Sequence, residues 1–165
     1  MSREEFIETM GTIIKEEASF RGYKYPSAIL AQAILESGFG TSELSYRANN
    51  YFGMKCGRYW NGASVSANTW EEYNGRTVDI TDNFRKYNDM RGCVIGYFDF
   101  ISTSRYANLR EATSAYNYIE TIKADGYATD SRYVDKCKNI IDTYNLTRFD
   151  NNADIDELAV AVIRG

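Results

Sequence analysis

Residues 31–42, AQAILESGFGTS, join an apolar helical run to one carboxylate, Glu36, and then to Gly38 and Gly40. Together with a proline suited to a first helical turn, the run predicts a helix over residues 26–36. The helix is apolar on nearly every side, which is typical of a helix buried on most of its faces. The glycines that follow favour the left-handed backbone that ends helices, so we expect the helix to stop there.

Glu36 is an unusual charge to find at the end of such a helix. Desolvation beside an apolar face raises the pKa of a carboxyl group, and the negative end of the helix dipole acts in the same direction. A carboxyl group that stays protonated near neutral pH is the general acid that glycoside cleavage needs. The alternative is that Glu36 turns to solvent and only ends the helix. The pattern favours the functional interpretation.

The rest of the chain predicts further helices and one β-hairpin. Apolar residues recur at helical spacing in the first segment and again after Tyr87. Between these segments, two β-prone runs flank Asn74-Gly75, the strongest short signal for a two-residue hairpin turn. The predicted helices cover residues 3–19, 26–36, 90–102, 114–124 and 130–144, the strands cover 65–73 and 76–84, and residues 49–61 form an aromatic, glycine-rich loop. The predicted fold class is α+β, mainly α.

The first strand of the hairpin carries two adjacent carboxylates, Glu71 and Glu72, which the alternation of side chains along the strand distinguishes. With a turn at Asn74-Gly75, Glu71 lies opposite Val78. Alternation then places Glu71 on the more apolar face and Glu72 on the other face, with Trp70 and Asp79. Glycoside cleavage needs a second carboxylate to stabilise positive charge or to activate water. From the pattern alone, an ordinary solvated hairpin tip explains both residues better.

Composition excludes several classes of protein. The formal net charge of −4 argues against a nucleic-acid partner, which would require a basic patch. No apolar run approaches the roughly 18 residues that span a bilayer, so we expect no membrane insertion. The chain has no histidine, so the usual metal ligand and the usual general base at neutral pH are both missing. Acid–base chemistry must come from Asp, Glu, Tyr, Lys or Cys, and no metal or cofactor is implied.

At 165 residues the chain is about one domain long. Residues 1–148 predict a single domain, and the polar stretch that follows predicts a linker and the start of a further unit over residues 149–165. The N-terminus is charged and lacks the apolar core of a secretion signal, so we expect synthesis in the cytoplasm. The odd, widely spaced cysteines, Cys56, Cys93 and Cys137, favour reduced thiols over a disulfide framework.

Residues 27–55, SAILAQAILESGFGTSELSYRANNYFGMK, resemble glycoside hydrolase family 73, a family of lysozyme-like peptidoglycan hydrolases. Both the family pattern A-Q-A-x-L-E-S-x-(W/F)-G-x-S and the later N-N-x-F-G-x-K occur in this stretch. The resemblance continues through T-x-E-x-x-N-G at residues 69–75, F-R-x-Y at 84–87 and G-Y-A-T-D-x-x-Y-x-x-K at 126–136. It covers nearly all of residues 4–144, with every motif in order.

The resemblance implies a lysozyme-like fold of two lobes, in which a β-hairpin lobe stands beside a helical lobe. It implies that Glu36 is the general acid, that Glu71 is the second catalytic group and that Tyr127 lines the catalytic centre. Alignment on the hairpin motif selects Glu71, with Glu72 as the alternative. The residues expected to bind the glycan are Asn50, Tyr51, Phe52, Tyr133 and Glu72.

On this resemblance we expect a peptidoglycan hydrolase, an endo-β-N-acetylglucosaminidase that cleaves the GlcNAc-β-1,4-MurNAc bond by inversion or by substrate assistance. The alternatives are an N-acetylmuramidase or lytic transglycosylase and, from another class, an inactive cell-wall-binding module. Residues 154–165, DIDELAVAVIRG, resemble the opening of a cell-wall-binding repeat of phage endolysins. This implies the catalytic domain of an endolysin, released through a holin to act on the cell wall. We expect a monomer whose partner is the peptidoglycan glycan strand, with no cofactor.

Overall fold

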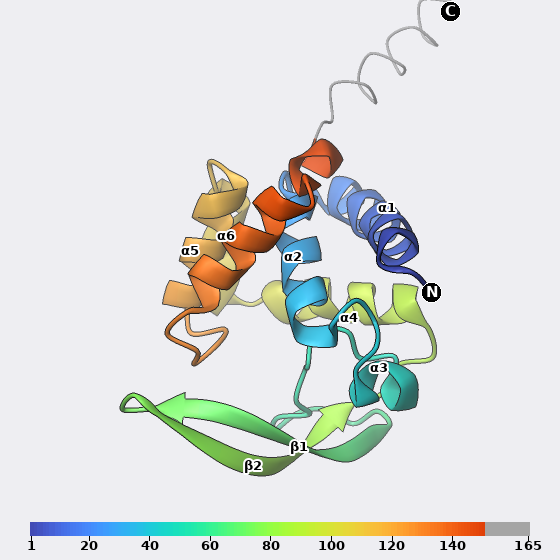
Figure 1. The fold of residues 1–165 in the computed structure, drawn as a ribbon, viewed down its shortest axis with the longest axis vertical. Helices are drawn as coiled ribbons and strands as arrows, with labels where there is room; N and C mark the ends of the chain where they lie inside the picture. The colour runs from blue at the N-terminus through green and yellow to red at the C-terminus, as the bar shows by residue number, and fades with distance from the viewer. Residues whose placement is uncertain (151–165) are drawn as a thin grey trace, which may run out of the picture.

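The computed structural model describes residues 1–150. In chain order its elements are α1 (Arg3–Arg21), α2 (Pro26–Ser37), α3 (Glu43–Ala48), β1 (Ser64–Tyr73), β2 (Arg76–Arg85), α4 (Met90–Ile101), η1 (Ser104–Glu111), α5 (Ala115–Ala124), α6 (Tyr133–Thr143) and η2 (Leu146–Asp150). Apart from the short α3, which packs against the strands, the helices form one lobe, and the β1–β2 hairpin stands beside it as a second lobe (Figure 1). This confirms the predicted mainly helical α+β fold with a hairpin lobe. A linker and the start of a further unit were predicted over residues 149–165. Residues 151–165 of this segment lie outside the described residues.

Helix α2 runs through the middle of the helical lobe, with α1, α4, α5 and α6 around it (Figure 1). Ten of its twelve residues are buried, as the apolar pattern predicted. Gly38 ends the helix in the left-handed conformation, with φ 54° and ψ 51°, and its N–H donates to the Ile34 carbonyl. At the other end Asp150 supplies the cap, because its carboxylate accepts the backbone N–H of Ser27 at 2.8 Å.

Four features of the helical elements differ from the sequence prediction. The short helix α3 and the 3₁₀ helices η1 and η2 were not predicted, since each is too short or too irregular to show a periodic apolar face. Helix α6 begins at Tyr133 and not at residue 130. The Asp130 carboxylate accepts the N–H of Arg132 at 2.9 Å and the Asp130 carbonyl accepts that of Tyr133, which makes residues 130–132 a turn.

The two strands pair antiparallel in the predicted register. Glu71 lies opposite Val78, and the chain reverses at Asn74-Gly75. Both turn residues have positive φ, 52° and 76°, which a type I′ turn requires at its two central positions. Because side chains alternate along a strand, this register places Glu71 and Glu72 on opposite faces of the hairpin.

The hairpin contributes no side chain to the hydrophobic core of the described chain, which the helices and their connecting segments build. Of the strand residues, Ala67 and Phe84 alone are buried, and both lie in the half of the hairpin away from the turn. In that half Lys55 forms an isolated bridge with Phe84 and so joins the hairpin to the loop before it. The half nearer the turn is mostly exposed, so apolar packing does not hold it in place.

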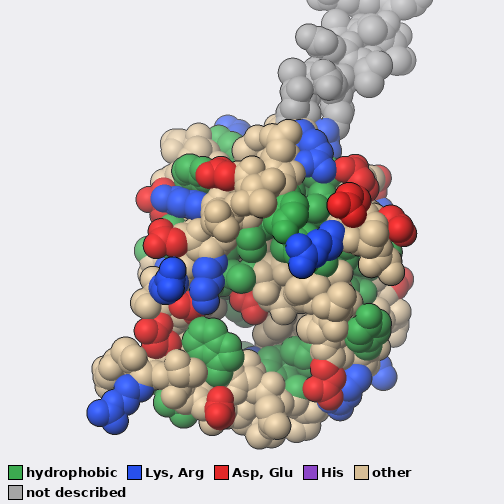
Figure 2. Space-filling model, in the orientation of Figure 1, with side chains coloured by type: hydrophobic (Ala, Val, Ile, Leu, Met, Phe, Trp, Pro, Cys, Tyr) green, Lys and Arg blue, Asp and Glu red, His purple; other side chains and the backbone are tan. Residues whose placement is uncertain are grey.

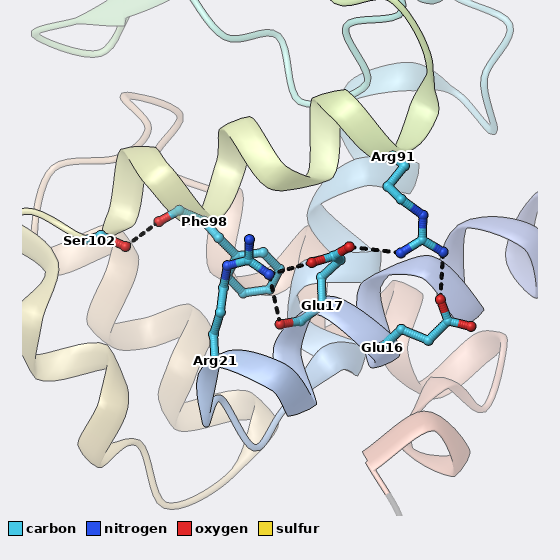
Figure 3. Close-up of polar contacts among 6 residues, drawn as sticks. All are labelled: Glu16, Glu17, Arg21, Arg91, Phe98 and Ser102. Atoms are coloured by element: carbon cyan, nitrogen blue, oxygen red, sulfur yellow. Dashed lines mark hydrogen bonds and ion pairs between the residues drawn. The ribbon is translucent and has the colours of Figure 1, made fainter.

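Ion pairs connect α1 to α4. Glu17 accepts hydrogen bonds from Arg21 on its own helix and, at 2.7 Å, from Arg91 on α4, which also contacts Glu16 (Figure 3). Burial alone would raise the pKa of Glu17, but the hydrogen bonds from Arg91 and Arg21 outweigh it and lower the pKa. The Arg21 guanidinium also lies over the Phe98 ring, 5.3 Å from its centroid. These contacts stabilise the helical lobe itself.

All three cysteines are free, as the sequence predicted. Burial raises the pKa of Cys93 and of Cys137 to about 12, so both thiols stay protonated near neutral pH. No helix among residues 1–150 is long and apolar enough to cross a membrane.

Candidate active site

A cavity of about 600 Å³ lies between the helical lobe and the hairpin. Its walls come from the end of α2, residues 52–57, both strands, residues 126–130 and the first turns of α6. Figure 2 shows a hollow between the hairpin and the body of the protein. Segments far apart in the sequence therefore meet around one space.

Glu36 lies in the wall of this cavity, at the last turn of α2. The residue as a whole is exposed, but its carboxyl group is surrounded by atoms of the cavity walls, which desolvate it. Burial raises the pKa of Glu36 to about 7; the negative charge of Asp130 adds to the rise and the positive charge of Lys136 opposes it. Near neutral pH the group is thus poised between its protonated and ionised forms, which suits a general acid.

Glu71 faces the same cavity from the hairpin. Its carboxylate forms an ion pair with Lys55 and accepts a hydrogen bond from the hydroxyl of Tyr73. Lys55 also lies 3.6 Å from a carboxylate oxygen of Asp82. An ammonium and a phenol that converge on Glu71 are the partners of an ionised carboxylate. The cavity therefore has a carboxyl group with a raised pKa in one wall and an ion-paired carboxylate in another.

Tyr127 and Tyr133 complete the wall on the side of the helical lobe. Burial raises the pKa of each phenol well above its ordinary value, and the charge of Glu36 adds to the rise in both. The Tyr127 hydroxyl is buried and has no hydrogen-bond partner among the described residues. A buried polar group without a partner carries a desolvation cost that a bound ligand can relieve. The Tyr127 hydroxyl therefore has a hydrogen-bonding capacity that the described residues leave unused.

A buried hydrogen-bond network lies beneath the site. Gln32, one turn before Glu36 on α2, donates to the Tyr133 hydroxyl at 2.9 Å. Its amide oxygen accepts from the Tyr97 hydroxyl at 2.6 Å, and that hydroxyl shares a further 2.6 Å hydrogen bond with Tyr118. The network connects α2 to α4, α5 and α6 one helical turn before Glu36.

The other residues expected to bind the glycan lie in different surroundings. Phe52 lines the cavity, whereas Asn50 and Tyr51 do not. The Asn50 amide is buried and donates to the carbonyls of Met54 and Arg85, each at 2.9 Å, so it shapes the loop beneath the cavity. Tyr51 packs against Phe6, with ring centroids 5.9 Å apart.

Glu72 also lies outside the cavity lining. Its carboxylate accepts the backbone N–H of Ser131 at 2.6 Å and the Ser131 hydroxyl at 3.0 Å. Its own backbone N–H donates to the Thr129 hydroxyl at 3.2 Å. Glu72 therefore joins the hairpin to the segment between α5 and α6, and both of its carboxylate oxygens are engaged.

The cavity wall also includes Trp70, Asp130 and Lys136, to which no role was assigned from the sequence. Lys136 donates to Asp130 at 2.5 Å and lies 5.5 Å from the centroid of the Trp70 ring. One signal for Lys136 was available, because it follows Tyr133 by three residues and so shares a helix face with it. The alternation of side chains along the strand gave no such signal for Trp70, because it placed Trp70 and Glu71 on different faces of the hairpin.

The site does not resemble a metal centre. Among residues 1–150 no group of three or more His, Cys, Asp or Glu side chains is placed to hold a metal ion. The chemistry that these residues support is acid-assisted cleavage of a glycosidic bond, in which one carboxyl group protonates the leaving oxygen and a carboxylate stabilises positive charge or activates water.

Comparisons with known proteins agree with this chemistry. The exo-glucosaminidase LytG of Bacillus subtilis (strain 168) is 35% identical over 131 residues, which cover 76% of this chain and 46% of LytG. A probable N-acetylmuramidase of Lactococcus lactis subsp. lactis (strain IL1403) is 39% identical over 158 residues, 90% of this chain and 35% of the relative. The chain thus spans less than half the length of these curated relatives.

The fold has a counterpart among solved structures. The catalytic domain of the autolysin Auto (Lmo1076) from Listeria monocytogenes superposes with a TM-score of 0.72 at 31% identity, over 89% of this chain and 86% of that domain. The sequence profile of the glucosaminidase family, described as mannosyl-glycoprotein endo-beta-N-acetylglucosaminidase, matches residues 11–146. Since that match covers most of the chain, the protein belongs to the glucosaminidase family, glycoside hydrolase family 73.

Proposed function

We propose that this protein hydrolyses the glycan strand of bacterial peptidoglycan as an endo-β-N-acetylglucosaminidase, at the GlcNAc-β-1,4-MurNAc bond. One observation carries the proposal. Glu36 lies in the wall of a cavity between two lobes, and its pKa is raised to about 7. A carboxyl group that keeps its proton near neutral pH, within reach of a bound polymer, can protonate the oxygen of the leaving sugar.

In this mechanism Glu36 donates its proton to the glycosidic oxygen as the bond to the anomeric carbon breaks. Positive charge then develops on the sugar ring, and the ionised Glu71 stabilises it or takes a proton from the attacking water. The ion pair between Glu71 and Lys55 keeps that carboxylate charged and oriented in the hairpin wall. The products are two shorter glycans, one of which carries the new reducing end.

Tyr127 is the proposed partner for the substrate beside these carboxyl groups. Its buried hydroxyl has no partner in the described residues, so a substrate acetamido group or the attacking water can satisfy it. Phe52 and Tyr133 shape the wall around it. We propose that Asn50 and Tyr51 act indirectly, because they hold the loop that carries Phe52.

The decisive test of the catalytic role is Glu36→Gln, which keeps the shape of the side chain and removes the proton donor. We expect the rate of glycan cleavage in purified cell walls to fall about 10³-fold or more, since general acid catalysis contributes about 10²–10⁴-fold. Glu111→Gln, on the exposed surface of η1, is the matched control and should leave the rate unchanged. Absence of cleavage by wild type would indicate an inactive wall-binding module instead, and equal cleavage by wild type and Glu36→Gln would overturn the role of Glu36.

A second candidate is cleavage of the other glycan bond, as a muramidase or a lytic transglycosylase. The similarity to a probable N-acetylmuramidase supports this second candidate. Mass spectrometry of the released fragments after borohydride reduction separates the three activities. Reduced GlcNAc ends indicate the glucosaminidase, reduced MurNAc ends a muramidase, and anhydro-MurNAc ends a transglycosylase.

We further propose that residues 1–148 form the catalytic domain and that residues 149–165 lead from it into a cell-wall-binding unit. A monomer synthesised in the cytoplasm, reaching the cell wall through a holin as phage endolysins do, fits the sequence resemblance of residues 154–165. Sedimentation of the purified chain, and binding of cell walls by the chain with and without residues 151–165, test these two points. The truncation keeps Phe149, which lies in the hydrophobic core, and Asp150, which caps α2.

A further inference from the structure

Glu72 makes the contacts that join the outer part of the hairpin to the helical lobe. Its carboxylate accepts the N–H and the hydroxyl of Ser131, at 2.6 and 3.0 Å, and its N–H donates to Thr129 at 3.2 Å. Figure 1 shows the segment between α5 and α6 reaching from the helical lobe towards the hairpin. We propose that Glu72 is a latch that positions Glu71 in the wall of the cavity.

The hairpin needs such a latch because the hydrophobic core does not hold it. No strand residue belongs to the core of the described chain, and the residues around the turn are exposed. The buried strand residues Ala67 and Phe84 lie in the other half of the hairpin. Without a second attachment, a twisted two-stranded ribbon is marginally stable and free to swing about its base.

Strand geometry couples the orientation of Glu72 to that of Glu71. Successive side chains of β1 point to opposite faces, so fixing the direction of Glu72 also fixes the direction of Glu71. Trp70 shares the face of Glu72 and lies 5.5 Å from the Lys136 ammonium, which adds a second contact to the helical lobe. Lys55 orients Glu71 from the loop side, and the latch sets its position relative to α6.

The contacts of Glu72 also distinguish a latch from a catalytic group. Both carboxylate oxygens accept hydrogen bonds, and the residue does not line the cavity. Hydrogen bonds in an exposed position compete with water and contribute only modestly to stability, so the latch can open under thermal motion. Opening would separate the hairpin from the segment before α6 and admit a glycan strand from the side.

The test compares three variants on a short soluble glycan of alternating GlcNAc and MurNAc. Glu72→Ala should lower kcat about tenfold, while KM changes less than about twofold, because the substrate still binds the helical wall. Glu72→Gln should restore most of kcat, since the amide oxygen still accepts the Ser131 N–H. Asp79→Ala should have the kcat and KM of wild type. Asp79 is an exposed acidic residue of β2 and takes no part in the hydrogen bonds of Glu72 to Ser131 and Thr129.

The pattern of results separates the roles of Glu72. If Glu72→Gln is as inactive as Glu72→Ala, then Glu72 acts through its ionisable carboxyl group and the latch is overturned. If Glu72→Ala keeps the wild-type kcat, the latch has no part in positioning Glu71. Thermal melting of the helical lobe should be the same in all three variants, because Glu72 lies outside the core.

The positioning of Glu71 rests on the proposed function, so a readout independent of activity accompanies the kinetics. Exchange of the Ser131 amide hydrogen with deuterated water should be faster in Glu72→Ala than in wild type, and unchanged in Asp79→Ala. Unchanged exchange in Glu72→Ala would overturn the latch itself. If wild type cleaves no glycan, the proposed function fails, and the exchange measurement alone decides whether the latch exists.

Discussion

The backbone of Gly53 lies directly against the carboxyl group of Glu36. A Cβ atom on Gly53 would stand 3.3 Å from Oε2 of Glu36, and Gly53 has a φ of +64°, which L side chains rarely adopt. The loop after α3 thus brings a residue without a side chain up to the proposed proton donor. Gly53 leaves the carboxyl group both the space and the open side that a substrate needs.

Gly53→Ala should therefore impair catalysis as well as stability. We expect kcat on peptidoglycan to fall about tenfold, through crowding of Glu36, and the free energy of unfolding to fall by about 1–2 kcal/mol through strain at positive φ. Gly22→Ala is the matched control, because Gly22 has a φ of +79°, lies outside the cavity lining, and a methyl group there would meet only the Arg110 side chain, at 3.7 Å. Steady-state kinetics and urea unfolding of both variants check this. Equal losses of kcat would show that backbone strain, and not contact with Glu36, is responsible.

The pH dependence of activity should report Glu36 and its two charged neighbours. Because the general acid must be protonated, activity should be lost as pH rises through about 7. Lys136→Met removes a positive charge that lowers the pKa of Glu36, so the alkaline limb should move to higher pH. Asp130→Asn removes a negative charge that raises the same pKa, so the limb should move to lower pH. Profiles of kcat against pH measure both shifts, and shifts in the same direction would contradict the assignment.

Stability should depend on pH through the same group. The pKa of Glu36 is about 7 in the folded protein against 4.5 for the ordinary group, so the native state holds a proton that the unfolded chain releases. The stabilisation from Glu36 is therefore complete below pH 4.5 and is lost as pH rises to about 7. Glu36→Gln should melt increasingly above wild type across that window, as calorimetry at a series of pH values will show. A constant difference between the two melting temperatures would argue against a raised pKa.

The buried network beneath the site should be costly to break. Gln32→Leu would leave the hydroxyls of Tyr97 and Tyr133 without their partner, and we expect a loss of about 2–4 kcal/mol in the free energy of unfolding. Tyr118→Phe removes one hydrogen bond at the edge of the network and should cost about 1 kcal/mol. Urea unfolding of both variants tests the difference. A loss below that of Tyr118→Phe would mean that the Gln32 amide is not the centre of the network.

Local patterns were enough to predict the main elements of the fold. The helix over residues 26–36 was predictable because its apolar residues and its terminal glycine act through the nearest turns of the chain. The hairpin register was predictable for the same reason, since Asn74-Gly75 fixes the pairing and the pairing fixes the faces. Short elements such as α3 and η1 were not predicted, because packing and not a periodic apolar pattern determines them.

The site was harder to predict because it depends on contacts between distant segments. Sequence motifs identified Glu36, Glu71 and Tyr127, and the structure places all three in the lining of the same cavity. Strand parity separated Glu71 from Glu72 but could not show that Glu72 contacts Ser131, 59 residues later in the chain. The roles of Asn50 and Tyr51 were equally hidden, since an aromatic loop gives no sign of which side chains turn inward.

A hairpin that lies outside the core has a thermodynamic consequence of its own. Regions with few buried apolar contacts open at a lower free energy than the globule as a whole. The strand wall of the cavity can therefore unravel as a separate cooperative unit while the helices around α2 stay folded. On heating, we expect the wall that carries Glu71 to open before the helices melt, and on cooling to form again on a helical scaffold that has stayed folded.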